Sequence, residues 1–101
     1  MPKLYEYLGL IIFFYSNEHE PIHVHGQCDD RESKAEFFLV EGEIVEIRIS
    51  EVKGRRPLIG KELQNFKKVV DVYATDIVQK WVAYFVYHRS IRPETITRRL
   101  L

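Results

Sequence analysis

The first half of the chain carries the apolar patterns that are typical of β-strands. Residues 7–15 are almost wholly apolar and rich in β-branched and aromatic types, which predicts one core strand covered on both faces. A polar turn containing Pro21 follows, and residues 22–25 are predicted to form a short second strand. Residues 26–32 are polar and are predicted to form a loop.

Residues 33–40 and 44–50 flank the sequence Glu41-Gly42-Glu43, which predicts a β-hairpin. Residues directly opposite each other in an antiparallel pair lie on the same face, so the better register matches apolar with apolar positions. A three-residue loop does this, since it pairs Leu39 with Val45, Phe37 with Ile47, and Ala35 with Ile49. A two-residue loop would set Phe37 opposite Glu46, and the three-residue loop is therefore predicted.

From Gly60 onward the apolar residues recur at helical spacing. One helix over residues 61–88 would be roughly 42 Å long at about 1.5 Å per residue, which is long for a domain of this size. A break near Ala74-Thr75 is expected, with Asp76 and Gln79 as a capping box, and a single bent helix is the alternative. The resulting prediction is an α+β fold, in which an antiparallel three- or four-stranded sheet packs against one bent helix or two helices.

The length and composition of the chain indicate a single domain. The 101 residues are 46% hydrophobic, which is enough for an ordinary core and argues against disorder. We expect a strand-rich part over residues 1–50, a helical part over 58–88 and a basic tail over 89–101. The apolar run at residues 8–15 is too short to span a membrane, so no membrane association is predicted. The single cysteine, Cys28, cannot form an internal disulfide, which favours a reducing compartment, and the cytoplasm is predicted.

The charge is balanced overall but not along the chain. The sequence has 15 Lys and Arg against 15 Asp and Glu, yet the first 50 residues carry a net charge of −6 and the rest +6. Four arginines in the basic half, Arg55, Arg56, Arg98 and Arg99, could contact an RNA backbone. The same charges could instead pair with an acidic protein partner or with the acidic half of a second copy.

A histidine-rich turn is the main chemical feature. His23 and His25 are two residues apart on a predicted strand and therefore point to the same face. With His19 as a third ligand they could bind zinc or another divalent metal ion. Without metal, His23 and His25 could act in acid–base catalysis, with Glu20 fixing a tautomer. The third alternative is a structural or ligand-contact role for the half-exposed histidines.

The segment from Phe13 to His25, followed by Lys34-Ala35 and much later by Trp81, resembles a bacterial family known as domain of unknown function 4160. Small proteins of that family are often encoded beside a second small protein and have been suspected of forming toxin and antitoxin pairs. The resemblance therefore implies a partner-binding or regulatory role and leaves any activity open.

The aromatic residues near the end of the predicted helix support an interface. Trp81, Tyr84 and Phe85 can face the sheet at about 100° per residue, whereas Tyr87 points away. Tyr87 with Val69 and Val72 would form a second apolar surface, which predicts a homodimer or a complex with a small protein. The sequence thus predicts a partner-binding regulatory module, and the alternative is a small metal- or His-dependent hydrolase or nuclease.

Overall fold

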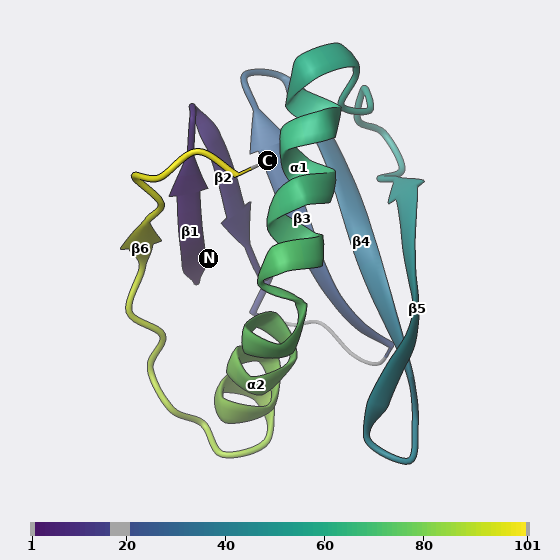
Figure 1. Cartoon of the computed structure of the whole chain (residues 1–101), viewed down its shortest axis with the longest axis vertical. Coiled ribbons are helices and arrows are strands. Elements are labelled where there is room, and N and C mark those ends of the chain that lie inside the picture. The colour runs from purple at the N-terminus through teal and green to yellow at the C-terminus, as the bar shows by residue number, and fades with distance from the viewer. Residues whose placement is uncertain (1, 17–20, 101) are drawn as a thin grey trace.

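The computed structural model describes residues 2–16 and 21–100, which form one mixed sheet and two helices (Figure 1). The strands are β1 (Lys3–Tyr7), β2 (Leu10–Phe13), β3 (Ile22–Cys28), β4 (Arg31–Val40), β5 (Glu43–Glu51) and β6 (Glu94–Thr95). The helices are α1 (Gly60–Val72) and α2 (Ala74–Phe85). The sheet order is β5-β4-β3-β2-β1-β6, with β6 parallel to β1 and the other pairs antiparallel. The α+β prediction is confirmed, but the sheet has more strands than predicted and is not purely antiparallel.

The prediction of one strand over residues 7–15 is wrong, because a tight turn divides this apolar run. Leu8 and Gly9 have φ values of 49° and 82°, which allows β2 to fold back on β1. Such paired positive φ angles give a two-residue hairpin the twist of its strands. Leu8 is exposed at the turn, although its residue type suggested a core position.

The predicted loop over residues 26–32 is also mostly strand. Strand β3 continues to Cys28, and β4 begins at Arg31, so only Asp29 and Asp30 form the turn. Asp29 adopts a φ of 55°, a conformation that aspartate accepts more readily than most residues. The extension matters for function because it places Glu32 inside the sheet.

The β4–β5 hairpin confirms the predicted register away from the turn and corrects it at the turn. Ala35 pairs with Ile49 and Phe37 with Ile47, as predicted. Leu39 pairs with Ile44 instead of Val45, because the register shifts between Phe38 and Leu39. The chain thus combines a two-residue turn at Glu41-Gly42, both with positive φ, with an irregularity that absorbs the extra residue.

The helical region is two helices, which is one of the two predicted alternatives. The break lies at Tyr73, whose ψ of 17° interrupts the helix one residue before the predicted position. The Asp76–Gln79 capping box is not formed, since Tyr73 is the N-cap of α2 and no side chain caps that end. Asp76 instead accepts a hydrogen bond from the Tyr5 hydroxyl, which ties α2 to β1.

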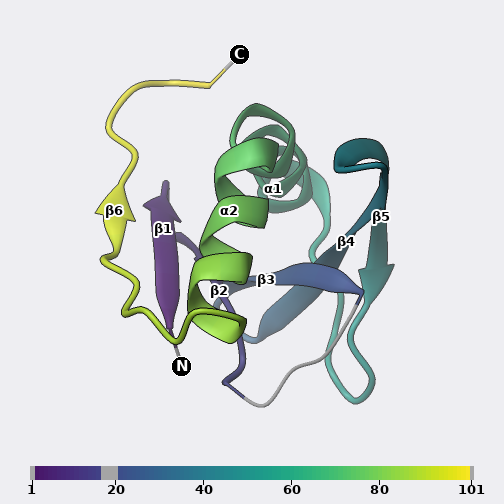
Figure 2. The same cartoon turned by 90° about the horizontal axis from the view of Figure 1, so that it is seen from below.

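Both helices lie on one side of the sheet (Figure 2). The main core is formed by side chains that the helices and this face of the sheet bury between them. Its fully buried members include Ile12, Val24 and Phe37 from the strands and Phe66 and Ile77 from the helices. The chain after α2 returns beside β1, where Ile96 and Leu100 are buried. The segment predicted as a basic tail, residues 89–101, is therefore basic but also contributes two apolar side chains to the core.

Two further expectations concern the surface. Val72 and Tyr87 are exposed as predicted, but Val69 is fully buried in the core, so the proposed second apolar surface lacks it. Within residues 2–16 and 21–100, no helix is both long and apolar enough to cross a membrane.

Candidate functional site

His23 and His25 point to the side of the sheet opposite the helices. Strand alternation puts Val24, a core residue, on the helix side and its two neighbours on the other side. The sequence prediction that the two imidazoles share a face is therefore confirmed. Their ring centroids are 5.3 Å apart.

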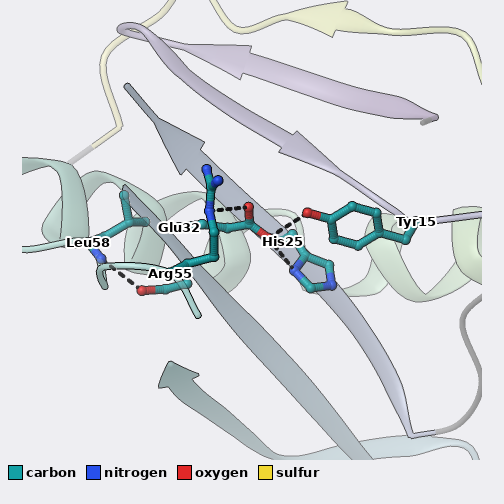
Figure 3. Close-up of polar contacts among 6 residues, drawn as sticks. Tyr15, His25, Glu32, Arg55 and Leu58 are labelled. Atoms are coloured by element: carbon teal, nitrogen blue, oxygen red, sulfur yellow. Dashed lines mark hydrogen bonds and ion pairs between the residues drawn. The ribbon is translucent and has the colours of Figure 1, made fainter. Parts of the chain in front are cut away.

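A buried carboxylate organises this face. The Glu32 side chain is only 1% exposed, and its Oε2 atom accepts a hydrogen bond from the Tyr15 hydroxyl at 2.9 Å. The same oxygen lies 3.1 Å from Nδ1 of His25, while Oε1 lies 3.5 Å from Nε of Arg55 (Figure 3). Burying a carboxylate is costly unless it is hydrogen-bonded and paired, and these three groups supply that compensation.

Aromatic rings enclose the imidazole of His25. Phe13 stacks against His25 with centroids 5.5 Å apart, and the Tyr15 ring meets His25 edge-on at 4.6 Å. Phe13 is fully buried even though it faces away from the helices, and the His25 side chain is only 5% exposed. Tyr15, His25, Glu32 and Arg55, together with Phe13 and His23, are called the Glu32 cluster below.

Hydrogen bonding fixes the tautomers of both histidines. The Pro21 carbonyl oxygen can only accept, so Nδ1 of His23, 2.7 Å away, carries the hydrogen. An ionised carboxylate also only accepts, so Glu32 holds the hydrogen of neutral His25 on Nδ1. In the neutral rings the lone pairs are therefore on Nε2.

The Glu32 cluster also anchors the connection between β5 and α1. The backbone N–H of Glu32 donates to the Arg56 carbonyl oxygen at 2.8 Å, and Arg31 donates to the Pro57 carbonyl oxygen at 3.1 Å. Next to them, the Leu58 N–H donates to Oγ of Ser33 at 2.9 Å (Figure 3). The cluster thus joins strands β3 and β4 to the start of the helical half.

The metal prediction gains no complete ligand set from the part of the chain that the structure describes. His23 and His25 are brought together as two donors, but residues 2–16 and 21–100 contain no group of three or more His, Cys, Asp or Glu side chains arranged to hold a metal ion. His19 and Glu20, the predicted third ligand and orienting carboxylate, lie outside the described residues.

The predicted basic contact residues have different surroundings. Arg55 faces Glu32, and Arg56 lies 3.7 Å from Asp30 on the surface. Arg98 lies over the Tyr73 ring, and Arg99 lines a cavity beside Lys61 and Lys68. Tyr87 lies just after α2 with the Arg89 guanidinium over its ring. Of the four arginines, Arg55 is the one that belongs to the Glu32 cluster.

A second feature lies on the helix side of the sheet, where β5 is only partly covered. Ile47 and Ile49 of β5 are only partly buried, whereas Phe37 on the neighbouring strand is fully buried. Three hollows of about 430, 470 and 480 Å³ run along β5, and neighbouring hollows share lining residues. Six of the apolar residues that line them define the β5 trough: Leu39, Ile44, Ile47, Ile49, Val70 and Val78.

Sequence reasoning found the two histidines but missed Glu32 and Tyr15. The available signal was the pair Asp29-Asp30, because a two-residue turn there sets Gln27 opposite Glu32 and brings Glu32 diagonal to His25. Treating residues 26–32 as a loop removed that register. The contact between Glu32 and Arg55 joins residues 23 positions apart, and nothing in the neighbouring sequence of either residue predicts it.

Comparison with known proteins gives a family but no described activity. The family model named Domain of unknown function (DUF4160) matches residues 9–82. This range contains every residue of the Glu32 cluster and of the β5 trough, and it ends before the C-terminal strand β6. Neither the curated proteins nor the solved structures include a significant match.

Proposed function

The chain belongs to the DUF4160 family, and we propose that it is a small partner-binding module, one half of a two-protein regulatory pair of the toxin and antitoxin kind. The β5 trough is the observation that supports this proposal. Its six apolar side chains come from the edge strand β5, from Leu39 of β4 and from both helices, and they form a surface that an apolar segment of a partner could bury.

The burial of apolar residues decreases across the sheet toward β5. Val24 of β3 and Phe37 of β4 are at most 1% exposed on the helix side, but Ile47 of β5 is only half-buried. Helix α1 contacts β2 and helix α2 contacts β3, so the helices cover the middle of the sheet. A partner that covered the apolar surface of β5 would therefore gain about 25 cal/mol of binding free energy for each Å² of apolar surface that it removes from water.

The charges beside the trough define the kind of partner that fits. Lys67 and Lys68 line the α1 side of the hollow at Ile47 and Ile49, and Asp71 lines this hollow and the next one. An apolar segment of a small protein, with acidic side chains opposite the two lysines and a basic side chain opposite Asp71, would match both the apolar floor and these charges. This occupant uses the basic half of the chain, as the charge asymmetry of the sequence suggested.

The test uses a photo-crosslinking amino acid at position 49, with position 11 as the control. Ile49 and Ile11 are both half-buried isoleucines, but Ile11 lies on β2 and faces the other side of the sheet. A small protein crosslinked in native cells only from position 49 is then purified. We expect its affinity to fall with Lys67→Glu/Lys68→Glu and to be unchanged with Lys61→Glu.

The proposal fails if no protein is crosslinked from position 49 beyond the position-11 background. It also fails if the purified candidate binds the Lys67→Glu/Lys68→Glu variant as well as it binds the unaltered chain. RNA recovered in place of protein, with binding lost in Arg55→Ala/Arg56→Ala, would assign the basic half to nucleic acid.

The Glu32 cluster favours a second candidate function, a His-dependent hydrolase or nuclease. The favouring observation is that His23 and His25 share one face of β3, with ring centroids 5.3 Å apart, and that the buried Glu32 carboxylate holds Nδ1 of His25, an arrangement that suits acid–base catalysis by histidine. His23 is the more exposed of the two histidines, whereas His25 is buried and is held in place by its contact with the Glu32 carboxylate.

Zinc, nickel and manganese titrations of tag-free protein test the metal form of this candidate. We expect His23→Ala/His25→Ala to abolish any thermal shift while circular dichroism is unchanged, with His88→Ala as the control. A metal-free form instead requires phosphodiester cleavage whose pH dependence changes in the same double variant. Absence of both responses in the unaltered protein excludes this candidate.

We also propose a cytoplasmic location, because the one thiol has no partner thiol in the sequence. Burial and the nearby carboxylates raise the pKa of Cys28, which keeps the thiol protonated and slow to oxidise. Cell fractionation tests the location directly.

A further inference from the structure

Strand β5 forms a long edge of the sheet. It pairs with β4 on one side, and the described residues place no strand on the other. It has nine residues, whereas β6 at the opposite edge has two. An edge strand presents N–H and C=O groups that can pair with another strand, so β5 offers a template of useful length.

The outward side chains of β5 are self-complementary. Glu46 and Arg48 lie on the face away from the helices, with Arg48 donating to Glu46 at 3.0 Å within the same chain. Both are well exposed, at 49% and 58% of their side chains. Two antiparallel copies of a strand are related by a two-fold axis, so each contact across that axis occurs twice.

The charges select one register. An axis at Ile47 sets Glu46 opposite Arg48 of the second copy, and does so twice. The like charges of Glu43 and Glu51 meet only at the two ends of the strand, where the irregularity at Val45 lies between Glu43 and the central pairs. An axis at Glu46 would set that carboxylate against itself, and an axis at Arg48 would set two guanidiniums together. An axis at Ile49 would set Arg48 against Ser50 and lose the ion pair.

Strand β4 also favours the register with the two-fold axis at Ile47. Glu36 of β4 lies directly opposite Arg48, so the row across the joined sheets would read Glu36, Arg48, then Glu46 of the second copy. Positive and negative groups alternate along it. On the helix side, the partly buried Ile47 would meet Ile47 of the second copy, which removes apolar surface from water.

We infer that β5 is a homodimerisation edge, and that two copies pair antiparallel through it about a two-fold axis at Ile47. The inference does not depend on a partner in the β5 trough, since the edge backbone and the outward charges carry it. A dimer joined in this way would have one continuous sheet.

The test measures the mass of the protein in solution by sedimentation equilibrium. The unaltered chain is expected to be a dimer. Arg48→Glu and Glu46→Arg should each weaken it by about tenfold or more, because like charges then lie directly opposite. Lys61→Glu, an exposed charge reversal on α1, serves as the control and should leave the dimer unchanged.

Mixing separates this contact from the ion pair within one chain. The Arg48→Glu and Glu46→Arg proteins, each weakened alone, should form a heterodimer in a 1:1 mixture, because positions 46 and 48 on opposite sides of the axis then carry opposite charges. The double variant Glu46→Arg/Arg48→Glu should recover the homodimer for the same reason. Circular dichroism checks that all four proteins are folded.

A strict monomer of the unaltered chain at the highest attainable concentration would overturn the inference. So would a dimer that resists both single reversals, or folded single variants that fail to associate on mixing. Loss of trough binding alone would not affect it, because that experiment alters Lys67 and Lys68 on the helix side.

Discussion

Gly26 of β3 lies against the ring of Phe66 of α1: a Cβ placed on Gly26 would be 2.5 Å from Cδ1 of that ring. Real Cβ atoms do not approach other atoms so closely, so the contact between sheet and helix requires glycine at this position. Phe66 is fully buried and cannot easily move aside.

We therefore expect Gly26→Ala to lower the free energy of unfolding by about 1 to 3 kcal/mol, the usual cost of overpacking a core. Urea denaturation followed by circular dichroism measures this change. Phe66→Leu should cost stability alone but less in the Gly26→Ala background, because the smaller side chain makes room. Equal effects of Phe66→Leu in both backgrounds would contradict the proposed contact.

Substitutions in the Glu32 cluster are expected to lower the free energy of unfolding by different amounts. Glu32→Ala leaves the Tyr15 hydroxyl and Nδ1 of His25 without their buried acceptor and should cost about 3 to 5 kcal/mol. Glu32→Gln retains one acceptor oxygen and should cost about 1 to 3 kcal/mol. Arg55→Ala should cost less than about 1 kcal/mol, since that side chain is 39% exposed.

Equilibrium unfolding in urea ranks these three variants. Nitrogen chemical shifts of His25 provide a second measurement, because loss of the carboxylate should release the Nδ1-protonated tautomer. A Glu32→Ala protein as stable as Arg55→Ala would show that the cluster does not join the strands to the β5–α1 connection.

Tyr5 predicts how stability depends on alkaline pH. Burial, and then the hydrogen bond to Asp76, raise the pKa of its phenol well above the ordinary value of about 10. The folded protein thus holds this proton more tightly than the unfolded chain does. The stabilisation is complete below about pH 10 and is lost as the pH rises further, by up to about 1.4 kcal/mol per pH unit.

Comparison of Tyr5→Phe with the unaltered protein isolates this effect from lysine titration. The variant should lose stability less steeply above about pH 10 in urea denaturation. Tyr87→Phe is the matched control, because Tyr87 is 63% exposed and should leave the slope unchanged. Identical slopes for all three proteins would contradict the buried phenol.

The C-terminal segment beyond the family match predicts a fourth result. Leu100 is 2% exposed, and its N–H donates to the Tyr7 hydroxyl at 3.0 Å. Leu100→Ala should cost about 2 to 5 kcal/mol, the range for buried leucines. Leu8→Ala, at an exposed turn position, should have little effect in the same urea titration. Equal effects would mean that the segment does not complete the core.

The sequence by itself determined the features that depend on local periodicity. The alternation of Ala35, Phe37 and Ile47 predicted the β4–β5 register away from the turn, and the helical spacing predicted the helical region. The length of that region favoured a break near Ala74-Thr75, with a single bent helix as the alternative, and the structure decided for two helices. The sequence also placed His23 and His25 on one strand face, because that relationship depends only on the two-residue repeat of a strand.

Turns and long-range contacts were decided by the tertiary structure. Leu8 favours a strand by residue type, but only the packing of β1 against β2 makes a turn there favourable. In the sequence Glu32 has the character of a polar loop residue. Its buried position arises only when β3 pairs with β4 and when Tyr15 and Arg55 pack against it. Such contacts have no signal in a short window of sequence, because their stabilisation arises only when segments far apart in the chain are packed together.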